Sequence, residues 1–311
     1  MKVGFFGTPE FSIPSLERFS KSRHQLVGVV TAPDRPRGRG KAVSPTPIAE
    51  AAQRLGLPIL KPVDFDNSDF LEALRAWNAD VFAVVAFRIL PEAVFAMPKF
   101  GSINLHASLL PAYRGAAPIQ WALWNGEKET GVTTFQIQQK VDSGNIYKQV
   151  RVEISDDDDA GSLGQKLAEA GARLLVETIS ELETGRLQAR GQNTDFATRA
   201  PKITREHTII DWKRPAGDIR NQIRALAPQP GASTSFDGHK IKIYRSEVND
   251  NPIGLKPGEL TINDQSITAG TGAGELRIME LQIEGKKRMN TTAFLRGFRP
   301  RGVFKLIGEK R

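Results

Sequence analysis

The chain has 311 residues and no cysteine, and its shares of hydrophobic residues, 40%, and charged residues, 25%, are those of an ordinary globular protein. This length predicts two domains, with one large domain as the alternative. The lack of cysteine excludes disulfide bonds, thiolate catalysis and cysteine-ligated zinc. No stretch approaches the roughly 18 consecutive apolar residues of a membrane helix, and the N-terminus has no signal-peptide pattern. We therefore expect a cytoplasmic protein with no membrane partner.

Short apolar runs rich in Val, Ile and Phe alternate with segments of helical spacing over the first half of the chain. The runs cover residues 2–6, 26–30, 81–87, 101–105 and 132–137. Strands that alternate with helices are typical of a parallel sheet. We therefore predict an α/β fold with a parallel-rich sheet.

The first strand runs into a turn at residues 4–9 that contains two glycines. The turn lacks the third glycine and the spacing of the G-x-G-x-x-G pattern. Phe5 and Phe6 would also keep a pyrophosphate away from the backbone. The fold can be Rossmann-like, but NAD is not the cofactor that we expect.

A basic segment follows the second apolar run. Its cations, separated by proline and glycine, are Arg35, Arg37, Arg39 and Lys41. Such a segment can present cations to phosphates or base edges. A solvated loop without a partner is the alternative.

The apolar strand near residue 105 ends with two polar residues, Asn104 and His106. A strand has a period of two, so both side chains lie on one face. The carboxyl ends of strands are where open α/β sheets bind ligands. The alternative is a strand-end turn that satisfies its own hydrogen bonds. We expect the other three histidines, His24, His207 and His239, to lie on the surface.

An amide and an imidazole together can catalyse acyl transfer, because the amide N–H stabilises an oxyanion and the imidazole moves a proton or adds a positive field. Asp142 is the candidate for the carboxylate that orients the imidazole, since its loop follows the run at residues 132–137 and lies at a carboxyl end if the sheet is parallel there. The chain has neither a G-x-S-x-G elbow nor a cysteine, so direct transfer is simpler than an acyl-enzyme route.

A long helix is predicted from Ala160 to Leu182, where apolar residues recur three or four apart. The run of four aspartates at 156–159 precedes it and suits the positive end of the helix dipole, while an acidic metal site is the competing interpretation. Residues 190–207 are the predicted linker. A second domain follows, with a helix at residues 216–225 and short strands at 241–244, 260–261 and 276–281, typical of a small β-barrel or similar β module.

The net charge of +8 lies entirely in residues 286–311, which hold nine Lys or Arg and one Glu. Phe294, Phe298 and Phe304 alternate with these cations, which predicts a packed segment that displays positive charge. A polyanion surface, with nucleic acid as the partner, is the favoured interpretation. A solvated basic terminus is the alternative.

Residues 108–115, which read Ser-Leu-Leu-Pro-Ala-Tyr-Arg-Gly after Asn104-Leu105-His106, resemble the signature of the folate-dependent formyltransferases. Further segments resemble the branch of that family that acts on methionyl-tRNA, namely residues 7–11, 33–41, 115–120, 200–204 and 286–289. The resemblance covers nearly the whole chain. One departure is visible, because relatives commonly have Ala-Tyr-Gly before Ile-Leu-Pro where this chain has Ala86, Phe87 and Arg88.

The resemblance implies a Rossmann-like formyltransferase domain at residues 1–189, a linker, and an OB-like β-barrel domain at residues 208–311 that binds tRNA. It implies 10-formyltetrahydrofolate as formyl donor and the α-amine of methionine on initiator tRNA as acceptor, with no metal and a monomeric protein. By matching position, the catalytic residues are Asn104, His106 and Asp142. The folate site includes Ser108, Leu109, Leu110 and Pro111. The tRNA contacts that we expect are Arg37, Arg39, Lys41, Lys286, Lys287 and Arg288.

Two alternatives remain open. Formyl transfer to a nucleotide or an amino sugar would use the same three residues, because they act only at the formyl carbon. A non-enzymatic RNA-binding protein would explain the basic tail but not the arrangement of Asn104, His106 and Asp142.

Overall fold

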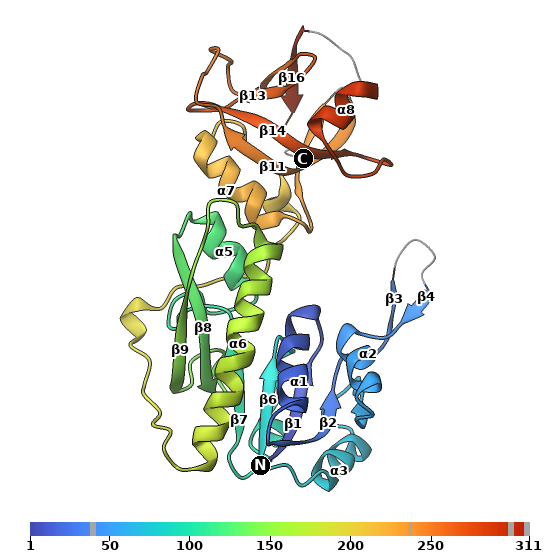
Figure 1. Ribbon diagram of the computed structural model, residues 1–311, viewed down its shortest axis with the longest axis vertical. Coiled ribbons are helices and arrows are strands. Elements are labelled where there is room, and N and C mark those ends of the chain that lie inside the picture. The colour runs from blue at the N-terminus through green and yellow to red at the C-terminus, as the bar shows by residue number, and fades with distance from the viewer. Residues whose placement is uncertain (38–41, 237, 298–301, 308–311) are drawn as a thin grey trace. The chain divides into compact units, whose positions relative to one another are not determined.

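A computed structural model describes residues 1–37, 42–236, 238–297 and 302–307. The chain forms two compact units, each described here by itself (Figure 1). Unit 1 comprises Met1–Pro118, Glu129–Glu153 and Gly164–Ala200. Unit 2 comprises Ile119–Lys128, Ile154–Leu163 and Pro201–Arg311. The predicted limits of the linker, residues 190 and 207, stay a prediction.

Unit 1 is built on a seven-stranded sheet with the order β5-β2-β1-β6-β7-β8-β9. The strands are β1 (Lys2–Gly7), β2 (Gln25–Val30), β5 (Ile59–Leu60), β6 (Val81–Val85), β7 (Ser102–His106), β8 (Glu129–Gln136) and β9 (Ile146–Glu153). The first five strands in this order run parallel, β8 is antiparallel to β7, and β9 is antiparallel to β8. The prediction of a parallel-rich sheet is confirmed.

The direction of winding reverses between β1 and β6, which are neighbours in the sheet although β2 and β5 lie between them in sequence. Gly7 at the end of β1 pairs with Val85 at the end of β6. In turn, Val85 pairs with Leu105 of β7. In open α/β sheets, ligands bind outside the carboxyl ends of the strands at such a switch point. This edge of the sheet is therefore where a ligand site is expected.

Helices cover this sheet through apolar faces. They are α1 (Ile13–Ser20), α2 (Pro47–Arg54), α3 (Ser68–Ala76), α4 (Glu92–Phe95) and most of α6 (Ala160–Glu183) (Figure 1). The predicted stripe of α6 is confirmed, because Leu163, Leu167, Leu175 and Ile179 are fully buried. Capping by the acidic run is also confirmed, since Asp159 Oδ1 accepts a hydrogen bond from Ser162 N at 2.8 Å.

The two glycines of the first strand serve packing. A Cβ atom on Gly4 would lie 2.7 Å from the ring of Phe82, and one on Gly7 would lie 2.8 Å from Ser12 Cβ. A Cβ atom cannot come so close to another atom. Glycine at these two positions therefore allows Phe82 and Ser12 to pack directly against the backbone of β1.

One predicted surface residue is buried instead. His24 is only 5% exposed, and its Nε2 lies 2.9 Å from Ser180 Oγ of α6. The prediction of a surface position was wrong for His24, because the contact joins residues 156 positions apart. None of the described helices is long and apolar enough to cross a membrane.

Unit 2 contains a closed antiparallel barrel, as predicted. Pairing between β11 and β14 closes a ring of six strands, and β15 (Met289–Asn290) is added beside β14. The ring consists of β10 (Ala232–Phe236), β11 (His239–Val248), β12 (Glu259–Ile262), β13 (Ile267–Gly270), β14 (Glu275–Ile283) and β16 (Gly302–Ile307). The helices of this unit include α5 (Pro118–Trp124), which begins at the last residue of the first segment of unit 1, α7 (Ala216–Leu226) and α8 (Thr291–Gly297).

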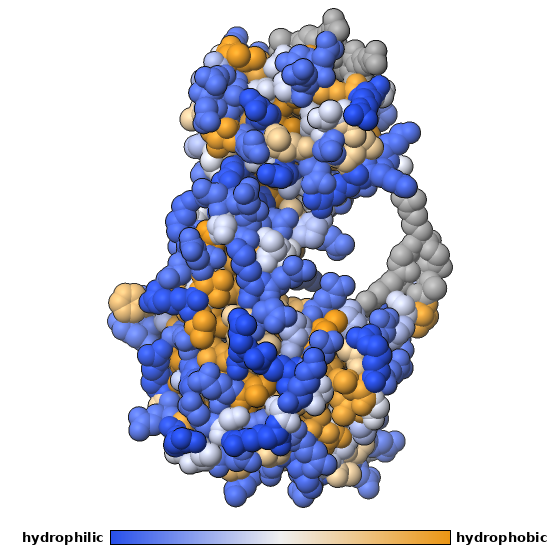
Figure 2. All heavy atoms as spheres, in the orientation of Figure 1, coloured by the Kyte–Doolittle hydropathy of each residue, from blue (hydrophilic) through white to orange (hydrophobic). Residues whose placement is uncertain are grey.

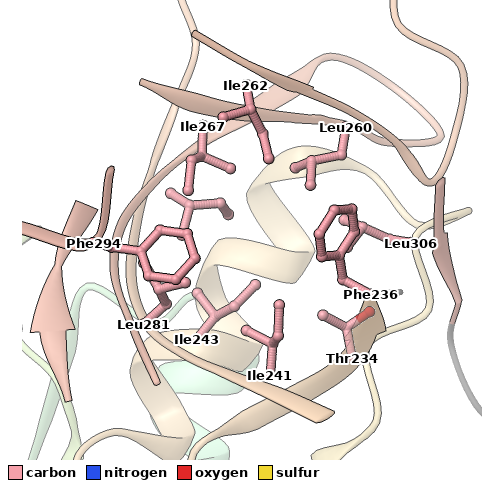
Figure 3. A pocket seen from close by; sticks show the side chains of 11 residues that line it. Thr234, Phe236, Ile241, Ile243, Leu260, Ile262, Ile267, Leu281, Phe294 and Leu306 are labelled. Carbon is pink, nitrogen blue, oxygen red and sulfur yellow. The ribbon is translucent and has the colours of Figure 1, made fainter. Parts of the chain in front are cut away.

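The interior of the barrel is a packed apolar core. Figure 3 shows side chains from several strands and from α8 pointing into it, among them Ile241, Ile262, Leu281 and Phe294. The space left between them is about 30 Å³. A ligand pocket usually measures about 300 Å³ or more, so the barrel interior is not a ligand site.

Parts of the two basic segments lie outside the described residues. Of the first segment, the structure describes the short strands β3 (Arg35–Arg37) and β4 (Ala42–Ser44), which pair antiparallel. Arg39 and Lys41 lie outside the described residues, as does Phe298. Phe294 and Phe304 pack against the barrel core, as predicted.

Candidate active site

Strand β7 carries Asn104 and His106 at the carboxyl edge of the sheet. His106 is 6% exposed and Asn104 is half-buried. Within the described part of the chain, the Asn104 side-chain amide has no hydrogen-bond partner. A half-buried amide that the fold leaves unused is available to a bound substrate.

A backbone carbonyl fixes the imidazole of His106. Its Nε2 lies 2.8 Å from the carbonyl oxygen of Tyr113, and the ring packs edge-on against Phe135. A carbonyl oxygen only accepts, so Nε2 carries the proton and donates it. In the neutral ring the lone pair is therefore on Nδ1. Sequence reasoning missed this contact, because a backbone carbonyl leaves no residue-type signal.

Asp142 approaches the other nitrogen of the same ring. Its Oδ2 lies 3.8 Å from His106 Nδ1, and the two side chains are 12% and 7% exposed. The distance is an ion-pair contact and exceeds a hydrogen bond. The same Oδ2 accepts a hydrogen bond from Gly115 N at 2.8 Å.

Asp142 reaches His106 by a route that differs from the predicted one. Strand β8 runs antiparallel to β7, so its last residue, Gln136, pairs with Ile103 near the start of β7. The assumption that the Asp142 loop follows a parallel strand was therefore wrong. The loop between β8 and β9 instead returns to the carboxyl end of β7, where the Asp142 carboxylate meets the His106 imidazole.

Two glycines make this return possible. A Cβ atom on Gly144 would lie 1.7 Å from the carbonyl oxygen of Gln136, and one on Gly115 would lie 2.6 Å from that of Ala200. Gly115 also has φ +127°, which side chains disfavour. Neither position can hold another residue without moving the backbone around Asp142.

The predicted folate segment, Ser108 to Pro111, begins two residues after His106 and is held by side chains of β8 and β9. Thr133 Oγ1 donates to Ser108 O at 2.6 Å and accepts from Leu110 N at 3.1 Å. Gln149 Nε2 donates to Leu110 O at 2.8 Å. The Ser108 and Leu110 side chains are buried, and Leu109 and Pro111 are half-buried. Their backbone and the two half-buried side chains therefore form the accessible part of this segment.

Arg88, the visible departure from the family pattern, is used within the fold. Its guanidinium donates to the carbonyl oxygens of Val63 at 2.9 Å and Pro62 at 2.5 Å, and its Cζ lies 3.9 Å from the centre of the Phe65 ring. Phe87 packs on Phe65. Arg88 thus ties the segment after β6 to the segment after β5.

The predicted tRNA-binding residues that the structure describes lie in different environments. Lys286 and Lys287 are exposed in unit 2. Arg288 instead donates two hydrogen bonds to Glu280, at 2.6 and 2.5 Å, and these bonds raise its pKa. The first basic segment places Arg37 at the end of β3.

Sequence reasoning did not single out a third basic region, which lies in unit 2 around a surface cavity of about 290 Å³. Its lining residues include Arg205, Lys240 and Lys242. The cations come from two distant parts of the sequence, so no run of charge marks them. Hydrophilic side chains dominate the face of the molecule that is shown in Figure 2, with smaller apolar groups between them.

Comparison with known proteins identifies the family. The formyl transferase family model matches residues 1–179, and the model of the formyl transferase C-terminal domain matches residues 202–299. The methionyl-tRNA formyltransferase of Chlorobium limicola is 44% identical over 307 residues, which are 96% of each chain. That of Pelotomaculum thermopropionicum is 43% identical over 313 residues and 99% of each chain.

Solved structures share the fold. The N-formyltransferase of Helicobacter canadensis, solved with folinic acid and dTDP-3-aminofucose, has a TM-score of 0.67 at 21% identity, over 89% of this chain and 98% of its own. The methionyl-tRNA formyltransferase of Clostridium thermocellum has a TM-score of 0.56 at 16% identity, over 81% and 95%. The extent and identity of the sequence matches place the chain within one family. The chain belongs to the methionyl-tRNA formyltransferase family of formyl transferases.

Proposed function

We propose that this protein transfers the formyl group of 10-formyltetrahydrofolate to the α-amino group of methionine on initiator tRNA, as a monomer in the cytoplasm. One observation carries the proposal. Asn104, whose amide has no partner among the described residues, lies on the same strand as His106, and Asp142 Oδ2 lies 3.8 Å from the His106 nitrogen that carries the lone pair. These are the groups that acyl transfer to an amine requires.

Asn104 stabilises the charge that develops in the transition state. The amine nitrogen attacks the formyl carbon, a C–N bond forms, and the carbonyl electron pair moves to oxygen. The side-chain N–H groups of Asn104, on β7, donate to this oxyanion. Losing one such donor typically slows a reaction about 100- to 1,000-fold.

His106 moves the proton. The hydrogen bond from Nε2 to Tyr113 leaves the lone pair on Nδ1, which accepts the proton that the attacking amine releases. The carboxylate of Asp142, 3.8 Å from Nδ1, then balances the charge of the imidazolium. The protonated ring also adds a positive field beside the oxyanion.

Collapse of the tetrahedral intermediate completes the transfer. The bond between the formyl carbon and the folate nitrogen breaks, and that nitrogen takes its electrons. The proton on Nδ1 of His106 passes to the same nitrogen. Tetrahydrofolate leaves, the methionine amine carries the formyl group, and His106 returns to its neutral form.

The acceptor is assigned from the family and the cations rather than from the three site residues. Sequence identity of 43% to 44% over nearly the whole chain supports a methionyl-tRNA acceptor. Exposed Lys286 and Lys287, together with the basic cavity at Arg205, Lys240 and Lys242, suit a polyanion. An amino sugar or a nucleotide would need few of these cations.

A comparison of acceptors tests the proposal. The protein is incubated with 10-formyltetrahydrofolate, and tetrahydrofolate release is followed with methionyl initiator tRNA, with methionine methyl ester, or with an amino sugar nucleotide. We expect rapid release with the charged tRNA alone, together with formylmethionine on the tRNA. Equal or faster turnover with the amino sugar nucleotide would contradict the proposed acceptor.

A further inference from the structure

Gln192 joins the Asp142 loop to the segment that carries Gly115. Its Nε2 donates to the carbonyl oxygens of Asp142 at 2.9 Å and Gly144 at 2.8 Å. Its Oε1 accepts from Arg114 Nε at 3.1 Å and Nη2 at 2.5 Å. One half-buried amide thus makes four hydrogen bonds, which is its full capacity.

The loop that Gln192 holds contains a residue in a sparsely populated backbone conformation. Asp142 has φ +51°, in the left-handed region that residues other than glycine rarely occupy. Such a conformation persists where its surroundings determine it. The backbone oxygen of Asp142 is held by Gln192 and its carboxylate by Gly115 N.

Arg114, which donates to Gln192, is itself held in place by backbone hydrogen bonds. Its backbone N donates to Thr198 O at 2.9 Å, and its backbone oxygen accepts from Ala200 N at 2.7 Å. Gly115, the next residue, donates to the Asp142 carboxylate. The Asp142 loop and the segment of Arg114 and Gly115 are therefore both anchored to residues 192–200.

We infer that Gln192 is a positioning residue for catalysis, because it holds Asp142 beside His106. This inference rests on the proposed function, in which the Asp142 carboxylate balances the charge of protonated His106. It assigns a role in the reaction to a residue that lies 50 positions from Asp142, inside the predicted linker.

Substitution of Gln192 by glutamate removes the hydrogen-bond donors of the side chain and keeps its acceptor. Gln192→Glu still accepts both hydrogen bonds from Arg114, but it has no N–H for the carbonyls of Asp142 and Gly144. A carboxylate oxygen facing two carbonyl oxygens pushes the loop away. We expect kcat to fall about 10- to 100-fold, as for a small displacement of a catalytic group, with KM for both substrates changed less than about threefold.

Two further variants guard against a purely structural effect. Gln192→Met has similar length and no charge, and it neither donates nor accepts, so the same fall in kcat is expected without a new carboxylate. Gln188→Glu is the matched control, because Gln188 is exposed and its side chain makes no hydrogen bond to the described residues. Melting temperatures are measured for every variant, and kcat is compared at a temperature where all are folded.

Combination with Asp142→Asn decides whether Gln192 acts through Asp142. If it does, the double variant Gln192→Glu with Asp142→Asn has about the same kcat as Asp142→Asn alone. Losses that multiply would overturn the inference. So would a Gln192→Glu protein that matches the Gln188→Glu control while Asp142→Asn is impaired, although the proposed function would then stand. An Asp142→Asn protein with normal kcat would contradict the proposed role of Asp142 and this inference with it.

Discussion

At the level of single residues, hydrogen bonds within the fold orient two of the three candidate catalytic side chains, His106 and Asp142. The carbonyl of Tyr113 sets the His106 ring, Gly115 N holds the Asp142 carboxylate, and the Asn104 amide has no partner in the described residues. An amide that is already satisfied would have to break a hydrogen bond to serve an oxyanion. Asn104 does not, and this is why it is the best candidate for the donor that acts in the transition state.

Arg88 gives a prediction at this scale. Arg88→Lys cannot bind the carbonyls of Pro62 and Val63 at once or stack as a flat group on Phe65. We expect this loss to cost about 1–2 kcal/mol and to lower the melting temperature of unit 1 by about 2–8 °C. Calorimetry measures the melting temperature. Arg75→Lys is the control, since that exposed arginine makes no such contacts within the described chain, and equal melting temperatures for the two variants would refute the role given to Arg88.

At the level of elements, the sequence predicted best the strands whose apolar runs are continuous. Strands β1, β6 and β7 are almost wholly buried and were predicted within two residues at either end. Strand β9 was missed, because it lies at the edge of the sheet and mixes buried with exposed positions. The direction of β8 could not be predicted either, since the composition of a strand does not encode which way it runs.

The same limit applies to the site. A period of two places Asn104 and His106 on one face, and this follows from the sequence of a single strand. The approach of Asp142 depends on Gly115, Gly144 and Gln192, which act through backbone contacts between distant segments. No local sequence pattern marks such contacts. Asp142 could therefore be named from the sequence, but the residues that hold it in place could not.

Strand β14 provides a prediction about pH. Glu275 is 2% exposed, and burial alone would raise its pKa, but hydrogen bonds from Leu255 N, Asn249 Nδ2 and Ile253 N outweigh burial and lower the pKa. A lowered pKa means that the stabilisation is present above the unfolded value of about 4.3 and is lost as the pH falls through the folded value.

Glu275→Gln removes this stabilisation, because its NH₂ group faces a donor. We expect the free energy of unfolding of unit 2 to fall by about 1–3 kcal/mol at pH 7, and the difference from the unchanged protein to shrink as the solution is acidified below pH 4. Urea titrations at several pH values measure it, with Glu284→Gln, an exposed position, as control. A difference that is constant with pH would show that the carboxylate charge is not the cause.

At the level of the whole molecule, positive charge is concentrated in particular regions, which are the candidates for a polyanion contact. The net charge of +8 lies in residues 286–311, and further cations line the cavity at Arg205, Lys240 and Lys242. Arg288 is already paired with Glu280, so it offers less charge to a phosphate than Lys286 or Lys287. The exposed Lys286 and Lys287 and the paired Arg288 are neighbours in sequence, so their contributions to tRNA binding can be compared directly.

Salt dependence measures which cations meet phosphates. Each phosphate contact contributes about one unit to the slope of log binding constant against log salt concentration. Substitution of both Lys286 and Lys287 by alanine should therefore reduce the slope for initiator tRNA by about two, whereas Arg288→Ala should leave it nearly unchanged. Identical slopes for the unchanged protein and the double lysine variant would exclude these two residues from the contact.

The proposed mechanism requires three side chains to converge around one carbonyl, and Asn104 is the one that acts on the oxyanion directly. The decisive measurement is the single-turnover rate of formyl transfer by Asn104→Ala, with both substrates saturating and the melting temperature checked against that of the unchanged protein. We predict a rate about 100- to 1,000-fold lower in a protein of unaltered stability. A rate within a few-fold of the original would contradict the assignment of the oxyanion to this edge of the sheet.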